Sequence, residues 1–499
     1  MRIDAYLSHL MLLLLVSVAV LHANASQSQQ AQLEKFILSR KARTSGSNKA
    51  SVRESGVRAK SSLHYLQAQA GYLGSDQSAL KAADMIRALP GQPHVDFDQY
   101  SGYVTVDEKH GRALFYYFVE APQDASSKPL LLWLNGGPGC SSFGYGAMLE
   151  LGPFRVNFDN TTLRLNKYAW NKEANVIFLE SPAGVGFSYS NTTSDYDESG
   201  DSKTAEDAYI FLVNWLERFP EYKTRAFYIS GESYAGHYVP QLAATILSHN
   251  LYNNRTIVNL QGILVGNPYL DEYKNQKGRF EYLWNHGVLS DEAWANITNH
   301  CSFNSSDNKL CSEFYAWYDF GPIDPYDIYA PICIDEPDGS YHSSSYLPGY
   351  NACDYYPTVT YLNDPVVQEA FHARKTEWSG CSDVIVDWKD APESMVPTLQ
   401  WLIMHGLPVW LFSGDFDAIC PLTATRYSIQ DLNISVTTPW RPWTAKMEVG
   451  GYVQQYAGGF TFITVRAAGH MVPSVQPERA LILLNYFLKG VLPPYIQER

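Results

Sequence analysis

Ser233 stands in the clearest chemical motif of the chain, a serine flanked by glycines. Residues 231–236 read Gly-Glu-Ser-Tyr-Ala-Gly and fit the pattern G-x-S-x-G, after a predicted strand and before a predicted helix. In such a strand-to-helix turn, glycines on both sides let the backbone pack without side-chain clashes and leave the serine exposed at the tip. The motif indicates a nucleophilic serine, whereas an ordinary serine in a glycine-rich loop is the alternative interpretation.

A serine hydroxyl is a weak nucleophile, so it needs a base that a third group orients. With this motif the order along the chain is serine, then acid, then histidine. Asp415 and Asp417 follow one apolar run, and His470 follows a later one. Both positions lie at the C-terminal ends of predicted strands, where doubly wound sheets place their sites. The residues alone do not distinguish Asp415 from Asp417, because the other aspartate could serve a turn.

A glycine-rich loop, Trp-Leu-Asn-Gly-Gly-Pro-Gly at 133–139, follows an earlier predicted strand. Acyl transfer needs hydrogen-bond donors for the developing oxyanion. We expect one donor to be the backbone amide of Gly137 in this loop and the other to be that of Tyr234, the residue after the nucleophile. A phosphate-binding loop is the alternative, but no Lys-Ser or Lys-Thr pair follows these glycines.

The elements that must position these residues alternate along the chain. Buried strands separated by helical patterns predict an α/β fold, with a mainly parallel central sheet and helices on both faces. Residues 205–219 predict a helix. Short apolar runs predict strands at 113–119, 129–134, 175–179, 226–230, 262–265, 408–412 and 460–465.

This alternation also gives the expected domain boundaries. Two parts of the core, 88–268 and 386–499, flank an insertion at 269–385 that holds five of the seven cysteines and is expected to form a lid. Residues 1–25 have the basic start, apolar run and small-residue cleavage site of a secretory signal. Residues 26–87 are expected to be a flexible leader or pro-segment, because their first part is poor in aromatics and cannot bury much apolar area.

Composition narrows the class of protein. The chain has 499 residues, 45% of them hydrophobic, and a formal net charge of −14. Nucleic-acid-binding surfaces are normally basic, so no nucleic-acid partner is expected. After the signal no apolar stretch is long enough to span a bilayer, so no membrane partner is expected once the signal is cleaved. Sequons for N-glycosylation agree with export and stand at Asn160, Asn191, Asn254, Asn296, Asn304 and Asn433.

Four motifs together resemble those of the serine carboxypeptidases, particularly the plant branch. They lie at 133–142, 180–189, 231–236 and 469–473, the last reading Gly-His-Met-Val-Pro. The resemblance extends from about residue 88 to 497 and implies an α/β-hydrolase fold with an inserted lid. It also implies that the triad acid is the second aspartate of Gly-Asp-x-Asp, which is Asp417.

The same resemblance implies a group that binds the free C-terminal carboxylate of a peptide. Several carboxyls in a partly dry pocket cannot all be charged, so at least one must hold a proton, which raises the apparent pKa of the group. Peptide affinity should therefore improve below neutral pH. Without the resemblance, Glu232 would be only the variable position of its motif and Glu150 a helix-end residue. The implied members are Trp133, Asn135, Gly136, Glu150 and Glu232.

The resemblance also implies a set of disulfides. It pairs Cys140 with Cys381, Cys301 with Cys311, and Cys333 with Cys353, and it leaves Cys420 unpaired. Cys420 lies three residues after Asp417 and is either a reactive thiol near the substrate or a buried small apolar residue. No cysteine spacing fits a structural zinc site, and the chemistry requires no metal or organic cofactor.

The sequence thus predicts a secreted, vacuolar or lysosome-like serine carboxypeptidase that cleaves the C-terminal bond of peptides and proteins through an acyl-enzyme. One alternative is an acyltransferase of the same fold, although those relatives typically carry Asp where this chain has Glu232. Another is a non-catalytic binding protein, which would usually lack a triad member. Peptide and protein C-termini are the expected partners, and a homodimer is left open.

Overall fold

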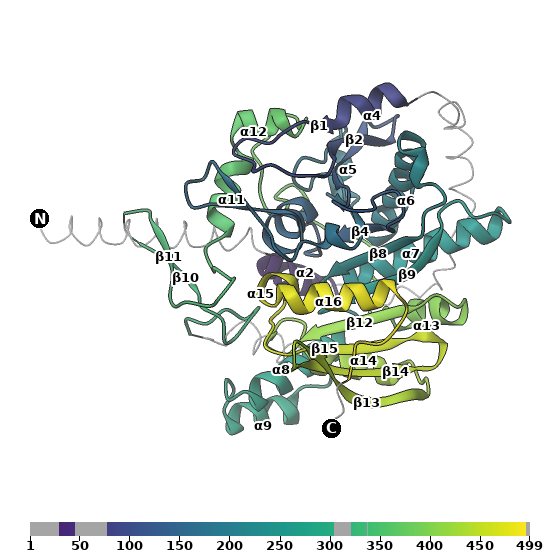
Figure 1. Cartoon of the computed structure of the whole chain (residues 1–499). Helices are drawn as coiled ribbons and strands as arrows, with labels where there is room; N and C mark the ends of the chain where they lie inside the picture. The colour runs from purple at the N-terminus through teal and green to yellow at the C-terminus, as the bar shows by residue number, and fades with distance from the viewer. Residues whose placement is uncertain (1–28, 45–76, 304–320, 337, 496–499) are drawn as a thin grey trace, which may run out of the picture.

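One large sheet organises the protein, for which the computed structural model describes residues 29–44, 77–303, 321–336 and 338–495. The sheet has 11 strands in the order β1-β2-β3-β7-β4-β8-β9-β12-β15-β14-β13 (Figure 1). Its strands are β1 (Met85–Ile86), β2 (Gln99–Asp107), β3 (Arg112–Val119), β4 (Leu130–Leu134), β7 (Asn175–Leu179), β8 (Phe227–Glu232), β9 (Leu260–Gly266), β12 (Val409–Gly414), β13 (Val436–Ala445), β14 (Glu448–Tyr456) and β15 (Thr461–Val465).

The centre of the sheet is parallel, as the sequence predicts. The six strands β7, β4, β8, β9, β12 and β15 pair in parallel with one another. On one side β1, β2 and β3 join the sheet in antiparallel pairs, and on the other side β14 and β13 do so. Every strand predicted from an apolar run corresponds to one of these strands, and the helix predicted at 205–219 corresponds to α6 (Asp201–Arg218). The antiparallel strands β1, β2, β13 and β14 were not predicted.

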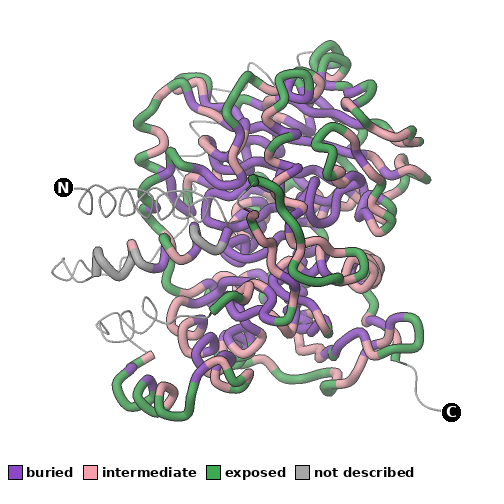
Figure 2. The backbone as a smooth tube through the Cα atoms, turned by 90° about the vertical axis from the view of Figure 1, so that its left-hand side faces the viewer, coloured by how far each residue is buried: buried purple, intermediate pink, exposed green. Residues whose placement is uncertain are grey.

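Alternate residues of the central strands enter two separate cores. In β3, Leu114, Tyr116 and Phe118 belong to one buried cluster, and the residues between them belong to the other. Because successive side chains point to opposite faces of a strand, continuous apolar runs indicate a sheet that is covered on both sides. Figure 2 shows the buried residues concentrated in the interior, with exposed residues on the surrounding loops.

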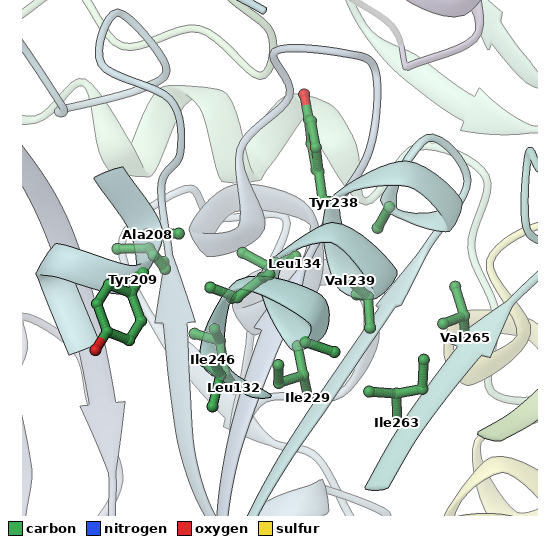
Figure 3. Packing of buried hydrophobic residues seen from close by; sticks show 14 of the residues in the cluster. Leu132, Leu134, Ala208, Tyr209, Ile229, Tyr238, Val239, Ile246, Ile263 and Val265 are labelled. Atoms are coloured by element: carbon green, nitrogen blue, oxygen red, sulfur yellow. The ribbon is translucent and has the colours of Figure 1, made fainter. Parts of the chain in front are cut away.

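Helices cover both faces of the sheet. α7 (Ala235–Tyr252) packs Val239 and Ile246 above Ile229 of β8 and Ile263 of β9 (Figure 3). α6, α13 (Val396–Met404) and α14 (Leu422–Asp431) contribute to the same core. On the opposite face lie the π-helical segment η2 (Ser142–Glu150) and α16 (Pro477–Leu488).

The insertion between β9 and β12 carries most of the remaining elements. Its helices include α8 (Glu272–Asn285), α9 (Asp291–His300), α11 (Tyr355–Leu362) and α12 (Pro365–Ala370), and β10 (Cys333–Asp335) pairs with β11 (Tyr341–Ser343). The other elements are α5 (Ser194–Asp197), α15 (Val472–Val475), the pair β5 (Phe154–Val156) and β6 (Leu163–Leu165), and the 3-10 turns η3 (Trp170–Lys172), η4 (Pro220–Tyr222) and η5 (Ala457–Gly459). Among the described residues, no helix is both long and apolar enough to cross a membrane.

The N-terminal region differs from the expected flexible leader. Residues 29–44 form the helix α2 (Gln29–Thr44), which buries Leu33, Phe36 and Ile37. The expectation that this stretch cannot bury much apolar area is therefore wrong, because its few apolar residues share one helical face. The folded body also begins earlier than residue 88, with α4 (Ser78–Asp84) and β1. The predicted signal at 1–25 lies outside the described residues.

Asp84 anchors this early segment to the sheet. Its carboxylate accepts hydrogen bonds from Arg218 Nη1 and from the Tyr116 hydroxyl, each at 2.7 Å. All three side chains are largely buried, so neither charge is well solvated. The contact explains why residues before Leu89 belong to the fold, although they carry no long apolar run.

We expect Asp84→Ala to lower the free energy of unfolding by about 3 kcal/mol, because it leaves the Arg218 guanidinium buried without its carboxylate. Urea unfolding followed by tryptophan fluorescence measures the change. Asp96→Ala is the matched control, since the Asp96 side chain is 83% exposed. If Asp84→Ala costs no more stability than this control, the anchoring role is wrong.

Candidate active site

Ser233 lies at a sharp turn between β8 and α7. Its φ angle of 64° is in the left-handed region, which residues other than glycine rarely adopt. The flanking glycines are required by close packing: a Cβ on Gly231 would lie 2.4 Å from the Leu134 carbonyl oxygen, and one on Gly236 would lie 2.3 Å from that of Tyr269. The turn therefore has the tight, strained geometry that the motif predicts.

His470 and Asp417 form the central polar contact of the site. His470 Nδ1 lies 2.7 Å from Asp417 Oδ2, and both side chains are fully buried. Asp415 makes a different contact, accepting a hydrogen bond from the Ala467 amide at 2.7 Å. Asp417, and not Asp415, is therefore the aspartate that contacts the imidazole.

Several donors hold the Asp417 carboxylate in place. Asn267 Nδ2 donates to it at 2.7 Å, and the backbone amides of Ile419 and Cys420 donate at 2.6 and 3.2 Å. Asn267 follows β9 directly, and the preceding residue, Gly266, accepts a hydrogen bond from the Ser233 amide at 3.1 Å. Two consecutive residues therefore brace the serine turn and the acid together. The sequence analysis missed Asn267, although its place after a strand and a glycine was a usable signal.

If Ser233 is the nucleophile and His470 its base, the Ser233 hydroxyl would hydrogen-bond to His470 Nε2. Both are buried, and neither has a hydrogen-bond partner among the described residues. Hydrogen bonds between catalytic groups are often long or poorly aligned until substrate is bound. Each atom therefore remains available for a hydrogen bond within the site.

The insertion contributes to the site through residues 325–326. The Tyr326 carbonyl oxygen accepts a hydrogen bond from the His470 amide at 2.7 Å, and the Tyr326 ring lies 4.5 Å from the imidazole ring. The Pro325 carbonyl oxygen accepts one from the Ala418 amide at 3.0 Å. The insertion therefore braces the histidine and acid loops directly. Nothing in the spacing or types of these residues predicted this contact.

The glycine-rich loop packs against the serine turn. A Cβ on Gly136 would lie 2.3 Å from the Tyr234 amide nitrogen and 2.9 Å from Ser233 Cβ, so only glycine fits there. The next residue, Gly137, has a φ of 112°, which also favours glycine. The loop that carries Gly137 therefore packs directly against the turn that carries Tyr234, the two residues whose amides are predicted as oxyanion donors.

A buried carboxyl cluster adjoins Ser233. Asn135 Nδ2 donates to Glu150 Oε1 at 2.8 Å and to Glu232 Oε1 at 3.1 Å. The Asn135 side chain is oriented in turn by Trp133, whose Nε1 donates to Asn135 Oδ1 at 2.7 Å. Trp133, Asn135, Glu150 and Glu232, which the sequence analysis grouped together, are thus joined by hydrogen bonds.

Burial shifts the titration of this cluster. It raises the pKa of Glu232 well above its usual range, and the neighbouring Glu150 carboxyl adds to that rise. Burial also raises the pKa of Glu150, although hydrogen bonds from Glu232 and Asn135 oppose the rise. Two close carboxyls that are both desolvated favour a shared proton over two negative charges.

Two of the three disulfides that the family resemblance implies lie within the described residues. Disulfides join Cys140 to Cys381 and Cys333 to Cys353. Cys301 is disulfide-bonded, while its expected partner Cys311 lies outside the described residues. Cys420 is free and fully buried, which favours the interpretation as a small apolar residue over that as a reactive thiol.

The structure describes five of the six predicted glycosylation sites. Asn304 lies outside the described residues. The other sequon asparagines are exposed, which is the accessibility that a glycan requires. They are Asn160, Asn191, Asn254, Asn296 and Asn433.

Comparison with known proteins gives a consistent result. A family model described as serine carboxypeptidase matches residues 90–490. Serine carboxypeptidase-like 28 from Arabidopsis thaliana is 51% identical over 431 residues, which cover 83% of this chain and 92% of the relative. Serine carboxypeptidase 24 from the same plant is 48% identical over 438 residues, covering 83% and 94%.

A solved structure resembles the whole fold. The crystal structure of Kex1Δp, a prohormone-processing carboxypeptidase from Saccharomyces cerevisiae, superposes with a TM-score of 0.68 at 23% identity and covers 82% of this chain and 96% of that one. At this identity the likeness concerns the fold alone. Together with the sheet order, it confirms the predicted α/β-hydrolase fold.

We expect the Cys420 thiol to react with a disulfide reagent at pH 8 on the order of 100-fold more slowly in the native protein than after unfolding. Burial raises the pKa of this thiol well above its usual range, so little reactive thiolate forms, and access is blocked as well. Absorbance at the reagent's thiolate band measures the rate. Cys420→Ser is the control that should remove the thiol titrated after unfolding, and rapid native labelling at Cys420 would contradict this expectation.

Proposed function

The chain belongs to the serine carboxypeptidase family, and we propose that it removes C-terminal residues from peptides with Ser233 as nucleophile. The observation that carries the proposal is the carboxyl cluster joined to the serine turn. Glu232 is adjacent to Ser233 in the chain and shares the Asn135 amide with Glu150. A protonatable receptor for a carboxylate beside a nucleophile is what an enzyme needs to cleave only the last peptide bond.

In the proposed reaction, His470 Nε2 takes the proton from the Ser233 hydroxyl as the serine oxygen attacks the last peptide carbonyl. Asp417, 2.7 Å from His470 Nδ1, orients the ring and stabilises the imidazolium that forms. The imidazolium then protonates the amine of the departing amino acid, leaving an acyl-enzyme ester on Ser233. A water molecule, deprotonated by His470, hydrolyses the ester and regenerates the hydroxyl.

The developing oxyanion would be stabilised by the backbone amides of Gly137 and Tyr234. The packing of Gly136 against the Tyr234 amide supports this assignment, because it holds the two segments in one arrangement. Preorganised donors of this kind lower the barrier because they need no reorientation during the reaction, and one donor contributes about 3 kcal/mol in a related case.

Substrate selection would depend on the shared proton of the carboxyl cluster. A peptide carboxylate placed beside Glu150 and Glu232 is repelled when both are ionised and accepts a hydrogen bond when one is protonated. Because the pKa values of both carboxyls are raised, that proton is held at higher pH than an ordinary glutamate would allow. Binding should therefore be strong in acid and weaken as the pH rises through the pKa values of the cluster.

We also propose that the protein is exported through the secretory pathway to the vacuole or the cell exterior. The disulfides Cys140–Cys381 and Cys333–Cys353 support an oxidising compartment, and the exposed sequons support glycosylation.

We expect Ser233→Ala to lower kcat by about a millionfold for a blocked dipeptide, the scale of the loss when other serine peptidases lose their nucleophile. The released amino acid measures activity, and fluorophosphonate labelling measures the nucleophile separately. Ser127→Ala is the control, because Ser127 is exposed and bonds only to a neighbouring turn.

The same dipeptide with an amidated C-terminus should be a poor substrate for the wild-type protein. Equal cleavage of the acid and the amide would contradict an exopeptidase, and transfer of the acyl group to an added alcohol in preference to water would favour the acyltransferase.

We expect Glu232→Gln to flatten the dependence of KM on pH. In the wild type, KM should rise from pH 5 to pH 8 as the cluster loses its proton, whereas glutamine keeps a hydrogen-bond donor at every pH. Initial rates over that range give kcat and KM separately. A variant whose KM still rises as steeply as that of the wild type would show that Glu232 does not carry the relevant proton.

A further inference from the structure

The helix α2 packs beside the serine turn through one face. Gln29, Gln32, Leu33, Phe36 and Ile37 are buried, and their spacing of three and four residues places them along one side of the helix. The Phe36 ring lies 4.8 Å from that of Tyr234 and 6.4 Å from that of Tyr269. In Figure 1 α2 lies near α15, which follows the His470 loop.

The first residue of α2 reaches the carboxyl cluster. Gln29 Nε2 donates to Glu232 Oε1 at 3.3 Å, and Gln32 Nε2 donates to the Ser382 carbonyl oxygen at 3.2 Å. Gln29 also forms part of the wall of a cavity of about 500 Å³, together with Tyr145, Tyr326 and Met471. The Gln29 carboxamide, a planar polar group, therefore occupies the position proposed for the substrate carboxylate.

A second polar contact of α2 involves a buried arginine. Arg279 of α8 pairs with Glu34 of α2, with 3.2 Å between Nη2 and Oε1, and its side chain is only 2% exposed. Arg279 is also close enough to Asp417 and Cys420 to interact with them electrostatically. Burial lowers the pKa of Arg279, and Glu34 opposes that shift. A buried guanidinium is stabilised by a carboxylate partner, so this position favours an acidic group.

The separation of the two contacts indicates which substrate residue Arg279 would meet. Glu34 follows Gln29 by five positions, which is a rise of about 7.5 Å along a helix axis together with a turn of about 140° around it, so this rise is only the axial part of their separation. An extended peptide covers about 3.3–3.6 Å per residue, so the same span corresponds to about two residues. This axial span, counted from the terminal carboxylate beside Glu232, and the interaction of Arg279 with Asp417 and Cys420 of the acid loop together point to the residue that precedes the scissile bond.

We propose that Arg279 selects an acidic side chain at the residue preceding the scissile bond, and that α2 competes with substrate by placing Glu34 on Arg279 and Gln29 on Glu232. This inference rests on the proposed carboxypeptidase function. The helix and the peptide would use the same two polar contacts, so they exclude each other. The apparent affinity for substrate would therefore fall in proportion to the fraction of protein in which α2 occupies these contacts.

The substrate test compares two blocked dipeptides that differ only in glutamate or glutamine before the scissile bond. The wild type should prefer the glutamate peptide about tenfold in kcat/KM, the scale of one charge-assisted hydrogen bond. Arg279→Gln should abolish this preference through a loss on the glutamate peptide, and Arg279→Lys should keep part of it because the charge remains. A ratio that is the same in the wild type and both variants would overturn the assignment of Arg279.

The competition test uses the full chain, with residues 29–44 verified by intact mass. Glu34→Gln should lower KM for both peptides by the same factor without changing kcat, because a weaker competitor is displaced more easily whatever the substrate. Phe36→Ala should lower KM further, and Lys35→Gln, on the exposed side of α2, is the matched control. Unchanged KM in both Glu34→Gln and Phe36→Ala would overturn the role of α2.

The outcomes separate this inference from the function on which it rests. Hydrolysis without the expected preference or KM changes would overturn the inference alone. Absence of amino acid release by the wild type and by Phe36→Ala would overturn the carboxypeptidase proposal, and the roles of Arg279 and α2 with it.

Discussion

The buried contact between His470 and Asp417 constrains most of the site around it. A carboxylate without solvent is stable only when donors surround it, and Asp417 receives donors from Asn267, from the amides after it and from His470. These groups follow β9, β12 and β15, which are neighbours in the parallel part of the sheet. Since the Ser233 amide bonds to Gly266 at the end of β9, the register of these strands also sets the position of the serine turn.

The carboxyl cluster adds a second electrostatic requirement at the same place. The proposed mechanism needs a neutral imidazole that accepts a proton and, at the same pH, a carboxyl that still holds one. An ordinary glutamate would lose its proton in the range where an ordinary histidine becomes a base. Burial of Glu150 and Glu232 raises their pKa values and so widens the range in which both conditions hold. Burial of these two carboxyls costs stability, but the pKa shifts that it causes support the proposed mechanism.

Some of this organisation could be read from the sequence, and some could not. β4 is a continuous apolar run followed by glycines, and β8 begins with an apolar run and ends in the serine motif, so both the strands and their proposed chemical role were predictable. β13 has only two buried residues and contains Arg441 and Pro442, so it lacks that signal. Asp415 and Asp417 stand two residues apart after the same strand, and only the contact with His470 distinguishes them. The contact of Tyr326 depends on how the insertion folds back, which spacing does not encode.

The helix α2 shows why average composition was a poor guide to the leader. Few apolar residues are needed when they recur every three or four positions, because together they form one continuous face. Under the proposed competition, the surface that receives this face would accept two different backbones, a helix of about 10 Å diameter and a narrower extended peptide. Apolar packing cannot be equally close for both. The shared recognition would therefore lie in Glu232 and Arg279, which can contact either occupant without matching its backbone.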